Sequence, residues 1–450
     1  MSSVKQLEKL LAQVNTLSKD KSDPELSDNG LIGHCLRTSI TYRLPEAAKS
    51  DRLIGFRMML RCLKRMNSQN RPPIAKGKGK QLVIQGNAKN AEKILNYITL
   101  QSGEKTDHFF SKEHAPLEGM ALSGSEKIKV LVKYLDTAIK CLFKKDRQHR
   151  SIWPWAALEA HCLLNYAREN KIERVYDFSP YLIDANWYTK LLMQEGIEVY
   201  RVPSSGPLKA HNKFMIGDHA TLSTPYQFME AEKYKQTIRP NQFHKWIPER
   251  AFEYIATYQN PDLPEPPPRS IGFYSHASWL RAKEGHSDNG LNIHQGELTL
   301  LGHLGELLKS EKEVQLVIFL HPRERLDSVI EETKAFYQAQ FPNTPFAFSD
   351  SNEQSADGFH KVDLGIAVYS TILYERLFSG YKSLIGNYGM NDFPDPDSSL
   401  ANICFQSKEA LFDQLQQAFD QNRNTFFAEK KITGYRFDDY PAMNKTNSKN

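Results

Sequence analysis

Two apolar segments in the C-terminal half, each ending abruptly in polar residues, constrain the fold most. Residues 316–325, LVIFLHPRER, read as a buried strand that stops at His321-Pro322, because proline cannot donate to a sheet ladder. Residues 363–385, DLGIAVYSTILYERLFSGYKSLI, read as a strand, a hydroxyl-rich turn, a helix and another strand. Apolar strands that alternate with helices predict a mostly parallel α/β sheet.

The polar residues that follow these strands predict a ligand site. Ligands of α/β sheets bind outside the carboxyl ends of the strands, near helix N-termini. One strand end offers His321 and Arg323, with Arg325 close by, and the other offers Ser370 and Thr371. These groups bind phosphate well, so we expect a nucleotide-linked ligand here. The alternatives are a strand-terminal histidine held by a backbone carbonyl and a simple helix cap.

The chain is expected to form more than one domain, because 450 residues exceed one ordinary hydrophobic core. The segment 260–269, NPDLPEPPPR, carries five prolines and predicts a stiff linker. We expect a helical extension, an α/β domain, the linker, a second α/β domain, and a closing segment with a disordered tail, at residues 1–75, 76–259, 260–269, 270–425 and 426–450.

Hydrophobic periodicity places the individual elements. Strands are predicted at 81–86, 174–178, 198–204, 270–277, 314–320, 346–350, 363–369 and 383–387, with strand and loop over 213–228. Helices are predicted at 91–100, 125–143, 155–168, 187–195, 293–308, 327–341, 372–379 and 407–421.

Composition narrows the partners and the compartment. A net charge of +5 does not indicate nucleic-acid binding. The five cysteines are widely spaced, which argues against a disulfide framework or a zinc site and favours a reducing compartment. With no signal-like N-terminus and no run of about 18 apolar residues, we expect a cytoplasmic protein. The basic run 140–150 before Trp153 and Trp155 suggests peripheral contact with the inner membrane; the alternative is a solvated helix end.

Further candidate residues lie close to the two strand ends. Ser275 and Ser278 follow the predicted strand of GFYSHASWLR, where small residues allow a ligand to approach the backbone. Tyr369 precedes the hydroxyl turn, and Glu375 lies one helical turn further on, where it can accept hydrogen bonds from ribose hydroxyls. We interpret Asp395-Pro-Asp397 as a turn, so no metal site is predicted.

The N-terminal half offers carboxylates as candidate general bases. Asp184 lies in a loop that enters a helix, and Asp218 lies in a predicted turn between strands. Either can take a proton from an acceptor hydroxyl, and either can instead be a helix cap or an ordinary turn residue.

The His-Pro pair after a strand and the later Ser-Thr turn resemble the donor domain of GT-B glycosyltransferases. The similarity is greatest to bacterial enzymes that use CMP-activated acidic sugars, the sialyltransferases and the capsule-type Kdo transferases. This resemblance implies two Rossmann-like domains facing across a cleft. It also implies that His321-Pro322 and Ser370-Thr371 contact the nucleotide phosphate and the cytidine ribose. The acidic-Asp-Gly motif that carries the base in the sialyltransferases is not found in the N-terminal half.

We therefore expect a metal-independent glycosyltransferase without cofactor that moves a sugar from a nucleotide donor to a hydroxyl of a surface glycan or glycolipid. The expected catalytic residues are His321 with Asp184 or Asp218. The expected donor-binding residues are Ser275, Ser278, His321, Pro322, Arg323, Tyr369, Ser370, Thr371 and Glu375. The alternatives are a CDP-glycerol-type polyol-phosphate transferase, a non-catalytic GT-B-like module of a polysaccharide assembly complex, and a nucleotide-sugar epimerase.

Overall fold

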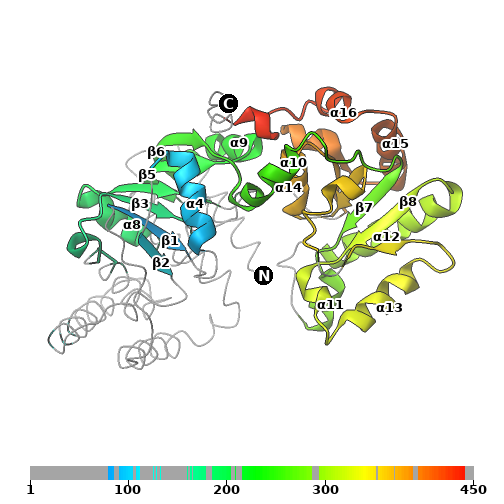
Figure 1. The fold of residues 1–450 in the computed structure, drawn as a ribbon, viewed down its shortest axis with the longest axis horizontal. Coiled ribbons are helices and arrows are strands. Elements are labelled where there is room, and N and C mark those ends of the chain that lie inside the picture. Colours follow the sequence, from blue (N-terminus) through cyan, green and yellow to red (C-terminus); the bar gives the residue numbers. More distant parts are fainter. Residues whose placement is uncertain are drawn as a thin grey trace. The chain divides into compact units, whose positions relative to one another are not determined.

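The computed structural model divides the chain into two compact units (Figure 1). The first comprises residues up to 223 together with 230–246, and the second comprises 224–229 together with 247–450. The proline-rich segment 260–269 therefore lies within the second unit. The structure describes residues 80–85, 91–104, 108–111, 125, 128, 132, 160, 163–164, 166–178, 185–203, 208, 215–285, 293–350, 353–368, 370–388 and 394–440.

The first unit is built on a six-stranded sheet, which we call sheet A, with the strand order β2-β1-β3-β4-β5-β6. Every neighbouring pair in it is parallel. Its strands are β1 Gln81–Gln85, β2 His108–Ser111, β3 Arg174–Asp177, β4 Glu198–Arg201, β5 Met215–Leu222 and β6 Ile238–Lys245. Helices α4 Ala91–Ser102 and α8 Ala185–Gln194 belong to this unit, while α9 Pro225–Lys233 has residues in both units, since 224–229 are part of the second.

The two faces of sheet A have different character. On one face, apolar strand residues such as Val175 and Val199 pack with Tyr188 and Leu192 of α8 in one buried cluster. Burial of such residues contributes about 25 cal/mol per Å² of apolar surface. The other face carries aromatic and polar residues, and there Tyr97 of α4 packs edge-on against Trp246.

The second unit contains another six-stranded sheet, sheet B, with the strand order β12-β11-β10-β7-β8-β9 and parallel pairing throughout. Its strands are β7 Ser270–Tyr274, β8 Gln315–Phe319, β9 Ala347–Phe348, β10 Leu364–Ala367, β11 Lys382–Gly386 and β12 Cys404–Phe405. Its α-helices are α10 Ile255–Tyr258, α11 Ser278–Lys283, α12 Ile293–Ser310, α13 Ile330–Gln340, α14 Ile372–Phe378, α15 Lys408–Phe419 and α16 Arg423–Glu429. The 3₁₀ turns are η5 Glu249–Tyr254, η6 Pro322–Arg325, η7 Phe359–Lys361, η8 Ser399–Ile403 and η9 Phe437–Asp439.

A fully buried arginine holds sheet B together at β10 and β11. The guanidinium of Arg376 donates to the carbonyl oxygens of Phe359 (2.7 Å), Val362 (2.6 Å) and Lys382 (2.9 Å). A Cβ atom at Gly365 of β10 would lie 2.5 Å from the Arg376 side chain, so glycine is required at this position. Because its donors are bonded to carbonyl oxygens, this buried cation is compensated within the unit.

The structure confirms the predicted α/β class with two Rossmann-like parallel-sheet units. The predicted cleft between them stays a prediction. The predicted extension at 1–75, the basic run 140–150 and the tail from 441 lie outside the described residues. The closing residues 423–440 contain α16 and η9, and Phe426, Phe427 and Tyr440 of this segment are buried.

Strands β2 and β6 have no counterpart in the sequence-based prediction, and β5 is one continuous strand where strand and loop were expected. The sequence of β6, IRPNQFHK, contains a proline and mostly polar residues. Such a sequence is tolerated because β6 is an edge strand, where Pro240 need not donate to a further neighbour.

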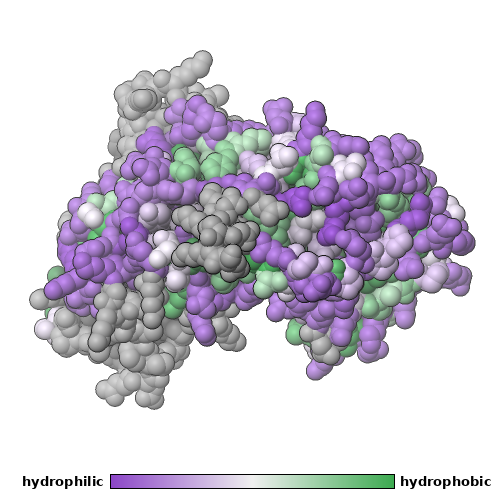
Figure 2. Space-filling model, turned by 45° about the horizontal axis from the view of Figure 1, so that its top comes forward, coloured by the Kyte–Doolittle hydropathy of each residue, from purple (hydrophilic) through white to green (hydrophobic). Residues whose placement is uncertain are grey.

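Hydrophilic residues dominate the described surface in the space-filling view, with apolar residues in smaller groups (Figure 2). Among the described residues, the large apolar side chains with high exposure are Ile128, Val132, Phe243 and Leu326. Within the part of the chain that the structure describes, no helix is long and apolar enough to cross a bilayer.

Candidate functional site at the carboxyl edge of sheet B

Five of the predicted donor-binding residues follow strands at the carboxyl edge of sheet B. From β7 the chain moves outward to β8 and β9 and then returns to β10 on the other side of β7. In open α/β sheets, ligands bind beside such a reversal of strand order. Ser275 and Ser278 follow β7, His321 follows β8, and Ser370 and Thr371 follow β10. The structure therefore places these five residues at one edge of one sheet, as the sequence predicts.

The imidazole of His321 is fixed where β8 runs into η6. Its Nδ1 accepts from the backbone N–H of Arg323 at 3.2 Å, and its backbone N–H donates to Glu324 Oε2 at 2.9 Å. Burial, followed by the positive charges of Arg281, His276, Arg323 and Arg325, lowers the pKa of His321 to about 4. His321 is therefore neutral near pH 7, and because Nδ1 accepts, the proton is on Nε2.

The buried carboxyl group of Glu324 anchors the turn between β8 and η6. It is completely buried and accepts from Trp279 Nε1 (2.6 Å) and the Tyr337 hydroxyl (3.2 Å) in addition to the His321 backbone. Burial raises the pKa of Glu324, against the effect of its hydrogen bonds. The position of His321 is thus set by packing from α11 and α13 as well as by its own strand.

The three arginines near His321 differ in what they bind. Arg323 forms an ion pair with Glu284 at 2.6 Å, and both groups are more than a third exposed. Arg325 donates to the carbonyl oxygens of Leu320 and Glu353 and therefore joins two loops. Arg281 of α11, by contrast, has a buried Nε with no hydrogen-bond partner among the described residues. Of these three arginines, Arg281 is therefore the one whose Nε can bond a ligand without first leaving a partner in the described part of the chain.

Arg281 was not singled out by the sequence, although it belongs to the segment GFYSHASWLR that was. Its distinguishing signal was its spacing, three residues after Ser278 in a short helix that follows a strand. Only the tertiary structure shows that its charge acts on His321, which lies 40 residues further along the chain.

The loop after β7 is held by a carboxyl group from α12. Glu297 Oε1 accepts from the His276 backbone at 2.7 Å, and Glu297 Oε2 accepts from both the backbone and the hydroxyl of Ser278. Between these contacts Ala277 adopts a left-handed backbone with φ of 54°. Burial raises the pKa of Glu297 to about 7. The carboxyl group of Glu297 therefore already accepts from the loop N–H groups of His276 and Ser278.

The hydroxyl groups of Ser275 and Ser278 both form hydrogen bonds that stabilise this loop. The Ser275 hydroxyl accepts from the Ala277 backbone N–H at 2.9 Å, and the Ser278 hydroxyl is bonded to Glu297. Their role in donor binding stays a prediction, and in this conformation each hydroxyl has a protein partner.

The residues after β10 meet side chains of η5. Arg250 donates to the Thr371 hydroxyl at 3.4 Å, and the Tyr254 hydroxyl donates to Glu375 Oε2 at 3.1 Å. Glu375 is 3% exposed, so a ribose hydroxyl would have to approach a buried carboxyl group. The Ser370 hydroxyl accepts from the Ile372 backbone at 3.4 Å. The roles of these residues in binding a ribose or a phosphate stay predictions.

Tyr369 and Asp184 lie outside the described residues. Asp218, in contrast, is well placed in β5, where its Oδ2 accepts from the Val199 backbone N–H of β4 at 2.9 Å. It lies inside a strand rather than in the turn that the sequence suggested. Its part as a general base stays a prediction.

The described residues contain no group of three or more His, Cys, Asp or Glu side chains that could hold a metal ion. Asp395 Oδ1 accepts from the backbone N–H of Asp397 at 3.1 Å. This is the hydrogen bond of a local turn.

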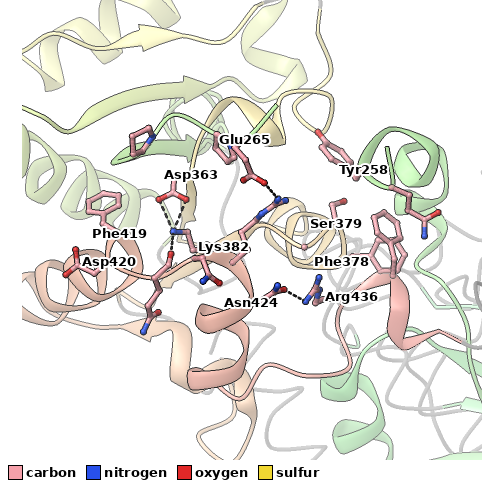
Figure 3. Close-up of a pocket in the computed structure, with 18 residues that line it drawn as sticks. Tyr258, Glu265, Asp363, Phe378, Ser379, Lys382, Phe419, Asp420, Asn424 and Arg436 are labelled. Carbon is pink, nitrogen blue, oxygen red and sulfur yellow. Dashed lines mark hydrogen bonds and ion pairs between the residues drawn. The ribbon is translucent and has the colours of Figure 1, made fainter. Parts of the chain in front are cut away.

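A cavity of about 970 Å³ lies at the opposite, amino edge of sheet B (Figure 3). Lys382, at the start of β11, is almost fully buried there, and its Nζ donates to Asp363 (2.9 Å) and to the carbonyl oxygens of Ala418 (2.6 Å) and Gln421 (2.9 Å). Arg423 is paired with Glu265. Lys382 and Arg423 in this cavity therefore both have acceptors for their charged groups. At the carboxyl edge, by contrast, Arg281 Nε has no hydrogen-bond partner among the described residues.

No protein-family model matches the sequence, and no curated protein sequence matches it. Among solved structures, the chain is similar to UDP-GlcNAc 2-epimerase from Neisseria meningitidis bound to UDP-GlcNAc, with 11% identity, a TM-score of 0.48, and coverage of 82% of this chain and 99% of that one. It is also similar to Acinetobacter baumannii MurG, with 13% identity, a TM-score of 0.44 and coverage of 82% and 98%. A third is a glycosyltransferase from Rickettsia africae, with 12% identity, a TM-score of 0.41 and coverage of 82% and 97%.

Proposed function

We propose that this protein is a glycosyltransferase that uses a nucleotide sugar and binds the donor phosphate at the carboxyl edge of β7 and β8. The observation that supports this most strongly is the buried Arg281 Nε, without a hydrogen-bond partner among the described residues, close to a neutral His321. A buried donor without a partner costs roughly 1–3 kcal/mol, and more when it is charged. A bound phosphate would remove that cost and compensate the local positive charge.

The two side chains suit the chemistry of a leaving phosphate. When the bond between the sugar and the phosphate breaks, the phosphate oxygen keeps the electron pair and gains negative charge. A guanidinium and an imidazole Nε2–H that are already oriented stabilise this charge more in the transition state than in the ground state. In this proposal Arg281 and His321 supply that stabilisation without a metal.

The acceptor oxygen forms the new bond to the sugar carbon and loses its proton to a base. The proposed acceptor is a hydroxyl of a surface glycan or glycolipid, and the proposed donor is a CMP-activated acidic sugar; both rest on the resemblance of the His-Pro and Ser-Thr motifs. Since the solved structures named above include one bound to UDP-GlcNAc, uridine nucleotides belong in the test as well.

The test is a thermal-shift panel of CMP, CDP, UMP, UDP, GDP and dTDP on the purified protein, with and without EDTA. We expect one nucleotide to raise the melting temperature independently of EDTA. CMP would favour the acidic-sugar donor, CDP the polyol-phosphate transferase, and UDP or GDP a conventional glycosyltransferase or epimerase.

Two variants of helix α11 connect the shift to the site. Arg281→Met should weaken the bound nucleotide about 10- to 100-fold, the equivalent of a charged hydrogen bond of roughly 1.5–3 kcal/mol. Lys283→Met is the matched control, because Lys283 lies on the same helix but forms an exposed ion pair with Glu332. No stabilisation by any nucleotide at millimolar concentration, or equal affinity in both variants, would contradict the proposal.

A further inference from the structure

One face of sheet A carries a row of polar side chains on three neighbouring strands. Glu198 and Tyr200 alternate along β4, Tyr200 is paired with His219 of β5, and His219 is paired with Gln242 of β6. Since residues two apart in a strand point to the same face, His244 shares this face as well. His219 follows Glu198 by 21 residues, and His244 follows His219 by 25.

Hydrogen bonds connect three of these side chains in series. Glu198 Oε1 lies 2.7 Å from His219 Nε2, and His219 Nδ1 lies 2.9 Å from His244 Nε2. The His219 ring stacks on Tyr200 with centroids 4.2 Å apart, which fixes its plane. The other carboxylate oxygen of Glu198 is paired with Arg174. Both nitrogens of the central histidine are therefore engaged.

This series fixes where the protons lie in the neutral state. A carboxylate only accepts, so His219 carries its proton on Nε2 and leaves Nδ1 as an acceptor. His244 must then donate from its Nε2, and the lone pair of His244 is on Nδ1. In the described part of the chain, Nδ1 of His244 makes no hydrogen bond. The outer end of the series is a basic nitrogen on a half-buried side chain.

The charges around the series keep it ready to accept a proton. Burial raises the pKa of Glu198, but the hydrogen bonds from Arg174 and His219 outweigh that effect and lower it, so Glu198 is ionised. Burial and the neighbouring His219 lower the pKa of His244, and Glu198 opposes them. Near pH 7 His244 is consequently neutral, with a carboxylate two hydrogen bonds away to stabilise the cation that forms on protonation.

We propose that Glu198, His219 and His244 form a proton relay, in which Nδ1 of His244 takes the proton of a hydroxyl group bound on this face of sheet A. The relay rests on the proposed glycosyl transfer for the identity of that hydroxyl. It would supply the base that the sequence left open between Asp184 and Asp218.

The proton balance of the step is simple. The hydroxyl O–H bond breaks and a bond from the proton to Nδ1 of His244 forms, while the oxygen keeps the electron pair and bonds to the sugar carbon. The leaving phosphate takes the electrons of the broken sugar bond. The new positive charge is shared with His219, and the ionised Glu198 compensates it. His244 would be the catalytic base, and His219 and Glu198 would be positioning residues.

The experiment compares wild type with His244→Gln, Glu198→Gln and the control Asn241→Ala, an exposed residue of β6 that points to the opposite face from His244. Release of nucleotide from UDP-N-acetylglucosamine and from CMP-N-acetylneuraminate, with water as acceptor, is measured from pH 5 to 9 beside nucleotide affinity. Histidine ¹⁵N spectra of the same samples report which ring nitrogens carry protons.

We expect His244→Gln to lower release about 10²- to 10⁴-fold, the usual size of a general-base effect, at unchanged nucleotide affinity. Glu198→Gln should lower the plateau rate and move the acid limb to lower pH, because Glu198 raises the pKa of His244 and its loss removes that effect. Asn241→Ala should match wild type. The spectra should show Nδ1 of His244 without a proton near pH 7.

The outcomes separate the two proposals. Wild-type release by His244→Gln, with nucleotide still bound, overturns the relay and leaves the proposed function standing. If no nucleotide binds wild type, the proposed function fails and the spectra decide on the relay alone. A proton on Nδ1 of His244, or a histidine titration that does not respond to Glu198→Gln, overturns it; the expected protonation pattern supports it.

Discussion

Two histidine sites, one in each unit, are surrounded by charges of opposite sign. His321, at the carboxyl edge of sheet B, has cations near it, and the carboxyl group of Glu324 bonds its backbone rather than its ring. His219, on the aromatic and polar face of sheet A, is bonded directly to the carboxylate of Glu198. The first arrangement suits binding an anion, and the second suits accepting a proton. The comparison shows that the neighbours of an imidazole, rather than the residue type, decide its chemistry.

The largest effect on the His321 site is expected from removing the carboxyl group of Glu324, which holds the turn that contains His321. Glu324→Ala would leave the buried donors of Trp279 and Tyr337 and the His321 backbone without their acceptor. We expect a loss of about 3 kcal/mol in the free energy of unfolding, measured by urea denaturation. Glu331→Ala, at an exposed ion pair of α13, is the control and should change it by less than about 0.5 kcal/mol. Equal stability of the two variants would show that Glu324 does not hold this turn.

The comparison is sharpened by titrating the two sites after removing one neighbour from each. Arg281→Met should raise the pKa of His321 from its value of about 4, because a nearby cation is lost. Glu198→Gln should shift the pKa of His244 downward, because an anion that raises this pKa is lost. Histidine NMR titration measures both, and shifts of the same sign would refute the contrast.

The same titration has a consequence for stability. The folded pKa of His321 lies below the ordinary value of about 6.5, so its contribution to stability is present above pH 6.5 and is lost as the pH falls through about 4. With a higher folded pKa, Arg281→Met should lose less stability over this range than wild type.

The smallest expected effect concerns the exposed arginine of the His-Pro segment. The sequence alone predicts that Arg323→Ala weakens donor binding by roughly 1–3 kcal/mol. Since Arg323 is already paired with Glu284 and more than a third exposed, we now expect less than about 1 kcal/mol, measured as a change in nucleotide dissociation constant. A loss as large as that of Arg281→Met would mean that Arg323 leaves Glu284 to bind the donor.

Much of the fold was predictable because its signals are local. Apolar runs such as 314–320 and helical periodicity such as 293–308 correspond to β8 and α12 within two residues at each end. Strand β6 was not predictable in this way, since Pro240 and its polar neighbours are tolerated only because the strand lies at the edge of the sheet. Because β6 was not predicted, nothing in the sequence indicated that His244 lies beside His219 of β5.

The sequence by itself determined the two parallel α/β sheets and the edge of sheet B near which His321, Ser275 and Thr371 lie. Hydrophobic periodicity and the residues that end a strand can both be recognised within a short segment of the chain. Only the tertiary structure decided which charges meet there. Arg281 and His321, like Glu198 and His244, are 40 or more residues apart, and no local pattern encodes a contact between them. Whether a histidine binds an anion or accepts a proton depends on burial and on charges within a few ångströms, and these exist only after folding.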